Sequence, residues 1–278
     1  MVVPESRAGW IHKCRRAEAL GYDVIGVADH LGMPAPFPAL VLAAESTERV
    51  RLTTFVLNAP LYNPVLLARD VAGTDQLTDG RLEVGLGAGY VQAEFEKAGM
   101  PFGTGSERVG HVESTVETLR KLFADPDSQP RPVQPGGPPL FIAGWGDRML
   151  KLAATHGDIV ALTGAAIGPG GVPRFAGATE IDSRVDYVRS MLGERAPSVE
   201  LNMPVHAVAA TSERNAVLDA FGAMLPSEAP DDLPMLLFGT PFEMAQQLRE
   251  RQDRFGLSYV TVLEPYLDAF APVIEQLR

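Results

Sequence analysis

The chain has 278 residues, of which 46% are hydrophobic and 21% are charged, a composition typical of a soluble globular protein. Its 35 acidic and 24 basic residues give a formal net charge of −11, which disfavours nucleic acid and anionic membranes as partners. The single cysteine, Cys14, excludes an intramolecular disulfide, and no Cys/His cluster has the spacing of a zinc site, so we expect no bound metal.

The N-terminal residues MVVPESRAGW lack the long apolar run of a signal peptide, and no apolar run of about 18 residues follows them. We therefore expect a cytoplasmic protein without a membrane span. Short β-branched apolar segments alternate with longer segments that carry charges at helical spacing, beginning with a helix around 10–20. Most of the short segments lack polar/apolar alternation, which predicts strands buried on both faces of a parallel sheet. These segments are 23–29, 51–58, 81–89, 139–144, 158–164, 200–211 and 258–264.

Seven strands separated by helices predict an α/β fold, namely a single (β/α)8 TIM-barrel domain over residues 1–278. A parallel barrel needs eight strands, and Met1–Val3 is the only segment available for the first. We therefore expect the first strand to be missing or truncated, either because the barrel is incomplete or because the chain begins late.

Several helix boundaries are marked by residue type. Asn63 followed by Pro64, and Thr240 followed by Pro241 and Glu243, have the pattern of an N-cap and a first helical turn. Glycines suited to the left-handed residue after a helix precede four strands, at Gly21, Gly80, Gly157 and Gly256.

Loop 165–178 is rich in glycine and proline and follows a predicted strand. Loops after the strands of a barrel line its active-site face, so this segment is a candidate substrate lid, although its composition also suits plain disorder. Residues 125–138 and 225–235 are further irregular segments.

Asp29 and His30 lie at the end of the predicted strand 23–29, and the carboxyl end of a strand is where catalytic groups lie in a barrel. A histidine at this position can transfer a proton or bind a cofactor ring near neutral pH. The alternative is that Asp29 caps the next loop and His30 is a rim residue without a catalytic role.

Two glycine-rich turns follow later strands. GLGAGY, residues 85–90, has the spacing G-x-G-x-G, so it is a weak dinucleotide motif. Its glycines allow close approach of a flat ring or a phosphate, or close packing of the protein itself. In AGWGDRMLKLAATHGD, residues 143–158, the N–H groups at a helix start can bind an anion, or the turn is an ordinary one with Asp147 as N-cap.

Together these segments resemble the luciferase-like monooxygenase superfamily, and specifically its coenzyme F420-dependent branch. The similarity covers nearly the whole chain in the right order, and its most specific block contains NP…LAR…D.L.DGR.E.GLGAG. The matching stretches are residues 15–30, 47–102, 138–158 and 239–277.

The resemblance implies a flavin or deazaflavin at the C-terminal end of the barrel. It implies that His30 lies beside the ring and assists proton transfer, and that Phe55–Val56 forms a strand bulge in which a non-proline cis peptide often supports the ring. The cofactor-binding residues that it implies are Asp29, Phe55, Val56, Asn58, Gly87, Ala88, Gly89, Gly144, Trp145, Gly146 and Asp147.

One position departs from the branch, because some deazaflavin enzymes carry a catalytic glutamate where this chain has Tyr90. A phenol can donate a proton but is a poor base at neutral pH, so Tyr90 is the second candidate catalytic residue after His30. The resemblance implies an F420-dependent oxidoreductase that transfers a hydride to or from a small organic substrate, in a homodimer. The alternatives are an FMN-dependent monooxygenase and a non-catalytic flavin-binding barrel.

Overall fold

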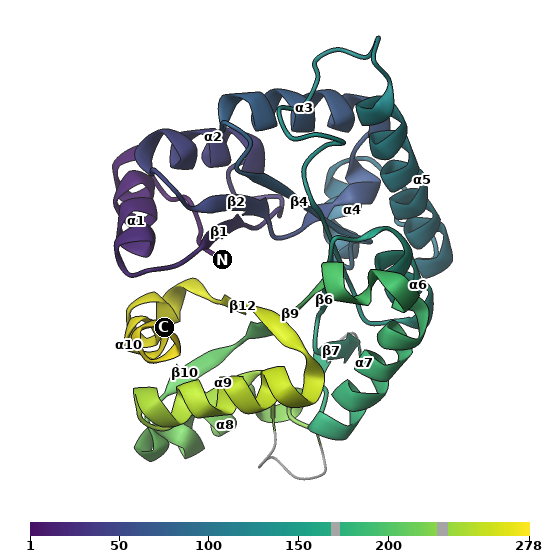
Figure 1. Ribbon diagram of the computed structural model, residues 1–278. Helices are drawn as coiled ribbons and strands as arrows, with labels where there is room; N and C mark the ends of the chain where they lie inside the picture. Colours follow the sequence, from purple (N-terminus) through teal and green to yellow (C-terminus); the bar gives the residue numbers. More distant parts are fainter. Residues whose placement is uncertain (168–172, 227–232) are drawn as a thin grey trace. The chain divides into compact units, whose positions relative to one another are not determined.

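Parallel strands connected by helices form both units of the computed structural model, which describes residues 1–167, 173–226 and 233–278 (Figure 1). The first unit spans Met1–Ala143 and the second Gly144–Arg278, and each is described by itself. Within the described ranges, no helix is both long enough and apolar enough to cross a membrane. The single domain over 1–278 stays a prediction.

The first unit contains a parallel sheet in the order β1, β2, β4 and β5, and short β3 also pairs with β4. All six residues of β4 are buried, as predicted for a strand covered on both faces. The strands are β1 (Val24–Val27), β2 (Arg51–Thr54), β3 (Leu57–Asn58), β4 (Leu82–Gly87) and β5 (Leu140–Gly144).

Helices follow the strands of this unit, and α2 and α3 lie one after the other along the sheet (Figure 1). The predicted start of α3 is confirmed, because Asn63 Oδ1 accepts the N–H groups of Val65 and Leu66. The helices are α1 (Arg7–Ala19), α2 (Pro36–Ser46), α3 (Pro64–Leu77), α4 (Gln92–Lys97) and α5 (Gly105–Ala124).

A bulge separates β2 from β3. Thr53 pairs with Glu83 and Leu57 pairs with Leu86, so four steps along this chain face three steps along β4. One extra residue is therefore accommodated between Thr53 and Leu57. The Thr54 hydroxyl connects the bulge to β4, because it donates to Gly85 O at 2.9 Å and accepts from Gly85 N at 2.8 Å.

The N-terminal segment Met1–Val3 forms a single β-bridge in place of a strand. Val2 pairs with Val27, and its N–H donates to Gly26 O at 2.9 Å. The expectation of a first strand reduced to a short remnant is confirmed.

The second unit contains a parallel sheet in the order β6, β9 and β12, with two small sheets that pair β7 with β8 and β10 with β11. β11, which was not predicted, directly follows the segment 225–235 that the sequence predicts to be irregular. The strands are β6 (Ile159–Leu162), β7 (Ala165–Ile167), β8 (Pro173–Phe175), β9 (Glu200–Val205), β10 (Ala207–Ala209), β11 (Leu236–Phe238) and β12 (Leu257–Val262).

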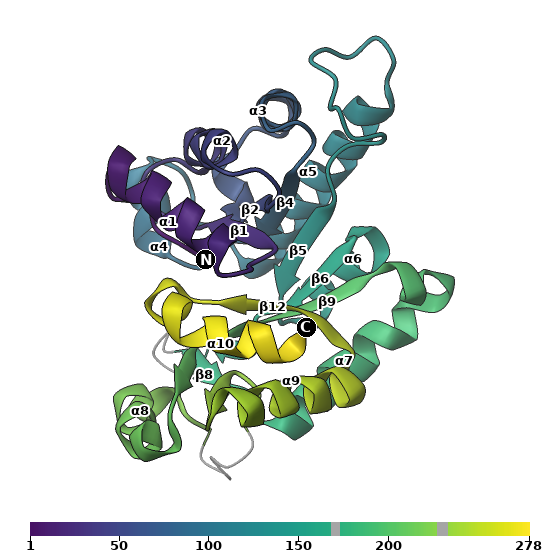
Figure 2. The ribbon, with the colours of Figure 1, turned by 60° about the vertical axis from the view of Figure 1, so that its left-hand side comes forward.

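Two C-terminal helices of this unit, α9 and α10, pack against each other (Figure 2). The predicted start of α9 is confirmed as a capping box, because Thr240 Oγ1 accepts from Glu243 N and the Glu243 carboxylate accepts from Thr240 N. The helices are α6 (Asp147–His156), α7 (Ala178–Leu192), α8 (Arg214–Phe221), α9 (Pro241–Phe255) and α10 (Leu267–Leu277).

Two local predictions need correction. Gly157 is not left-handed: its φ is −75°, although Gly21, Gly80 and Gly256 have positive φ as expected. The candidate lid at 165–178 is not a simple loop, because β7 and β8 form an antiparallel pair within it and α7 begins at Ala178. Residues 168–172 of the candidate lid, and residues 227–232 of the irregular segment 225–235, lie outside the described residues.

Candidate functional site

Asp29 and His30 directly follow β1, at the carboxyl end of the first unit's parallel sheet. The peptide bond between Phe55 and Val56 is cis, as the resemblance implies. Phe55 N donates to Val27 O at 2.7 Å, which attaches the bulge to the end of β1. The structure therefore brings the first four predicted residues of the site to one edge of this sheet.

The Asp29 carboxylate is held by two donors and is largely buried. Its Oδ2 atom accepts from Asn58 N at 2.9 Å and from the Tyr62 hydroxyl at 3.0 Å. Burial raises the pKa of Asp29 above its usual value, because the two hydrogen bonds that favour the charged form do not fully offset desolvation. Burial and the nearby Asp29 charge also raise the pKa of Tyr62, so its hydroxyl remains a donor at neutral pH.

His30 is partly buried between a carboxylate and an aromatic ring. Its Nδ1 atom lies 2.8 Å from Glu94 Oε1, and the same oxygen accepts the N–H of Leu31 at 3.2 Å. The Tyr90 ring stands edge-on to the imidazole, with 6.1 Å between ring centroids. Tyr90 itself is 63% exposed, so the two predicted catalytic residues are neighbours with different access to solvent.

The glycines of β4 and the turn after it let residues 54–58 pack closely against them. A Cβ added to Gly87 would come within 2.7 Å of Val56 Cγ2, and one added to Gly89 would overlap Asn58 Oδ1. Gly89 has φ +68°, a conformation that L side chains rarely adopt. Close packing of the protein therefore explains these glycines, whether or not a ring also approaches them.

Asn58 carries a buried acceptor without a donor. The residue is 6% exposed, and within the described part of the chain its Oδ1 atom has no hydrogen-bond partner. A buried acceptor in this state costs free energy unless a ligand or water donates to it. The geometry thus leaves one unsatisfied polar atom beside the Gly87–Gly89 turn.

Arg108 on α5 fixes the turn that precedes Tyr90. Its Nε atom donates to Gly89 O at 3.2 Å, and Nη1 donates to Gly103 O at 3.0 Å. The guanidinium also lies over the Phe102 ring, 3.9 Å from the ring centroid. Burial lowers the pKa of Arg108, which nevertheless remains a cation at neutral pH.

The other predicted set, Gly144 to Asp147, belongs to the second unit and begins α6. Gly146 is the N-cap and Asp147 the first helical residue, so the alternative with Asp147 as N-cap is wrong. The Asp147 carboxylate pairs with Arg184 on α7, which offsets its negative charge at this helix start. Gly144 is required by Met149, whose Cγ a Cβ at this position would overlap, whereas a Cβ at Gly146 would meet nothing within 4 Å.

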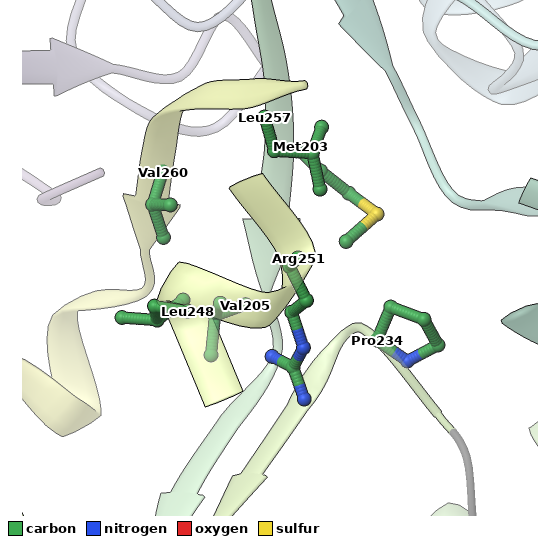
Figure 3. Close-up of a pocket in the computed structure, with 7 residues that line it drawn as sticks. All are labelled: Met203, Val205, Pro234, Leu248, Arg251, Leu257 and Val260. Carbon is green, nitrogen blue, oxygen red and sulfur yellow. The ribbon is translucent and has the colours of Figure 1, made fainter. Parts of the chain in front are cut away.

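The second unit also contains a small apolar pocket between its sheet and α9 (Figure 3). Its one charged side chain, Arg251, donates from Nη2 to Leu236 O at 2.8 Å and so attaches α9 to β11. No residue of this pocket was predicted to be functional, and we attribute it to packing. Its lining residues are Met203, Val205, Pro234, Leu248, Arg251, Leu257 and Val260.

Two residues of the site, Tyr62 and Glu94, were not predicted from the sequence. The structure buries Glu94, which is 8% exposed. The apolar residue next to Glu94, Phe95, indicates that this stretch is partly buried, but it does not identify a partner 64 residues away. Among the described residues, no group of three or more His, Cys, Asp and Glu side chains could hold a metal ion.

Asp29→Asn is expected to raise the free energy of unfolding at pH 7. Because burial raises the pKa of Asp29 in the folded state, its contribution to stability is present at acid pH and is lost as the pH rises through that pKa. The gain from asparagine should therefore shrink at pH 3, where wild-type Asp29 is largely protonated. Urea unfolding at both pH values measures it, with the exposed Asp23→Asn as control. Equal destabilisation by Asp29→Asn at both pH values would contradict the expectation.

The fold and the site define a class of α/β proteins with parallel strands and polar residues at the strands' carboxyl ends. Comparison with known proteins identifies the family: the model of the luciferase-like monooxygenases matches residues 11–176, more than half of the chain. The chain belongs to the luciferase-like monooxygenase family.

Relatives of both cofactor classes are found. The chain is 28% identical to the oxygenase component of a flavin-dependent trigonelline monooxygenase from Acinetobacter baylyi, over 60% of this chain and 51% of that protein. It is 33% identical to an F420-dependent glucose-6-phosphate dehydrogenase from Beutenbergia cavernae, over 51% of this chain and 48% of that protein. The chain thus spans about half the length of the curated relatives it matches.

Solved structures show the fold. An F420-dependent secondary alcohol dehydrogenase, in complex with an F420-acetone adduct, matches with a TM-score of 0.76 at 17% identity, over 99% of this chain and 96% of that one. The predicted fold class, an α/β parallel-sheet protein of the luciferase-like TIM-barrel type, is confirmed.

Proposed function

We propose that this chain is a coenzyme F420-dependent oxidoreductase, with FMN as the alternative cofactor and a small organic molecule as substrate. The observation that carries the proposal is the placement of His30 beside Asp29 and Glu94 at the carboxyl end of the sheet. An imidazole there can exchange a proton near neutral pH while a hydride moves to or from a bound cofactor. The F420-dependent relative supports F420, and the flavin-dependent relative supports the alternative.

The residues present fit a flavin or deazaflavin. Both ring systems carry an N–H that can donate a hydrogen bond, and Asn58 Oδ1 is a buried acceptor for which the described residues supply no donor. We infer that the ring is held by Asn58 together with the first unit's other predicted residues, Asp29, Phe55, Val56, Gly87, Ala88 and Gly89. For Gly144, Trp145, Gly146 and Asp147 we propose that backbone N–H groups bind a phosphate, with the charge of Asp147 offset by Arg184.

Residues of this chain would transfer the proton. When bound, the cofactor supplies the centre that accepts a hydride from a substrate C–H bond. His30 accepts the proton that the substrate hydroxyl loses in the same oxidation, and returns it to solvent. We propose that Tyr90 donates a hydrogen bond to the substrate; its exposure and its edge-on position beside His30 support this role.

Titration of the purified protein with F420 and, separately, with FMN tests the assignment. We expect quenching of F420 fluorescence with a Kd at least tenfold lower than that for FMN. Affinity for FMN with none for F420 would overturn the F420 assignment and favour the monooxygenase. Turnover is then measured with 2-propanol and glucose 6-phosphate under F420, and with trigonelline under reduced FMN in air. Cofactor binding without turnover of any substrate would favour the non-catalytic barrel.

We also infer a cytoplasmic homodimer that does not bind nucleic acid. The net charge of −11 opposes binding to phosphate backbones, and a single cysteine suits a reducing compartment. Light scattering in solution measures the oligomeric state.

A further inference from the structure

We infer that Glu94 is a positioning residue that fixes the tautomer and orientation of His30, so that Nε2 is the nitrogen that exchanges the substrate proton. The inference rests on the proposed role of His30 in proton transfer. It starts from one oxygen atom, Glu94 Oε1, which lies 2.8 Å from His30 Nδ1 and 3.2 Å from Leu31 N.

The backbone N–H of Leu31 can only donate, so Glu94 Oε1 is an acceptor. An acceptor at 2.8 Å from a ring nitrogen requires that nitrogen to carry the proton, which places N–H on Nδ1 of His30. In a neutral imidazole the other nitrogen, Nε2, is then the acceptor. The contact therefore selects the tautomer in which Nε2 can take up a proton.

Other glutamates of this chain show that the role of Glu94 is unusual for its helix position. Glu107 in α5 and Glu243 in α9 stand at the third helical residue and fold back to bond the N-cap backbone of their own helices. Glu94 stands at the third residue of α4, but its Oε1 atom reaches across to residues 30 and 31. A glutamate at this position usually caps its own helix, whereas Glu94 binds the His30 ring.

The surroundings of His30 contain further titratable groups. Asp29 lies on the same segment, Glu94 on α4 and Tyr90 after β4, and the Glu94 charge also acts on Asp29. Of these groups, Glu94 has a hydrogen bond to the ring and is buried to 8% exposure. Burial restricts its rotamers, which is what a residue that orients another must provide.

Tautomer measurement in the cofactor-free protein tests the inference. Long-range ¹H–¹⁵N spectra of ring-labelled histidine, with His30 assigned through His30→Gln, report which nitrogen carries the proton at neutral pH. We expect wild type to show a protonated Nδ1, Glu94→Ala to lose this preference, and Glu94→Gln to restore it, because an amide oxygen still accepts. The matched control is Glu96→Ala on the same helix, an exposed glutamate that pairs with Gln92.

Activity gives an independent readout. We expect Glu94→Ala to lower kcat about ten- to 100-fold with less than a twofold change in cofactor Kd, and Glu94→Gln to recover most of the loss. An unchanged His30 tautomer in Glu94→Ala would overturn the inference. Should that variant not fold, Glu94→Leu, which fills the site without an acceptor, takes its place. Absence of F420 and FMN binding would instead overturn the proposed function, and it would leave the tautomer result intact.

Discussion

His30→Gln is expected to lower kcat by about 100-fold or more while the protein remains folded. Glutamine can hydrogen-bond to Glu94 but cannot exchange a proton near neutral pH, and positioned acid–base groups contribute about 100- to 10,000-fold to rates. The measurement is steady-state turnover with the cofactor and substrate that the binding and turnover assays select. Cofactor Kd is measured in parallel, to separate loss of proton transfer from loss of binding.

The matched control is His12→Gln, because His12 is exposed on α1. It should leave kcat and Kd unchanged. A His30→Gln variant that turns over substrate at the wild-type rate would show that His30 does not transfer the proton. Tyr90 would then be the remaining candidate catalytic residue. A variant that has lost cofactor affinity alone would make His30 a binding residue.

Gly85→Ala is expected to destabilise the protein by about 3 kcal/mol. The added Cβ would overlap the carbonyl oxygen of Thr54, and a backbone atom cannot rotate away as a flexible side chain can. The hydrogen bonds between Gly85 and the Thr54 hydroxyl would also be disturbed. Urea unfolding measures the free energy, and cofactor binding by the folded fraction should weaken because the bulge carries Phe55 to Asn58.

Gly73→Ala provides the opposite control. Gly73 lies inside α3, and a Cβ there would meet nothing within 4 Å, so alanine should stabilise the protein by about 0.5–1 kcal/mol. If both substitutions changed stability equally, close packing of β4 against Thr54 would not explain Gly85.

The fold class and the starts of two helices could be predicted because they depend on local signals. Buried runs such as 82–87 are apolar at successive positions, and the N-caps Asn63 and Thr240 use side chains that bond within one turn. Because His30 follows a predicted strand, the sequence alone predicts that it lies at the carboxyl end of the sheet.

Features that depend on distant pairing could not be read from the chain. Glu94 reaches His30 across 64 residues, and Tyr62 reaches Asp29 across 33, with no periodicity to connect them. The β7–β8 pair was not predicted because the glycine and proline content of 165–178 is typical of a loop. In the structure, strand pairing overrides this local preference. Gly157 was misassigned because a glycine can follow a helix in an extended conformation as well as a left-handed one.

The extra residue between Thr53 and Leu57 has a consequence for how sequences of this kind should be aligned. Side chains alternate between the faces of a strand, so a single inserted residue exchanges the faces of everything after it. The insertion therefore contributes to directing the Asn58 amide, and not the Leu57 side chain, toward Gly89. Removing one residue from 54–56 would remove the extra residue that makes this bulge, and with it the geometry that carries Phe55 and Val56. In this segment the number of residues matters as well as their identity, so an alignment of related sequences should keep 54–56 free of gaps.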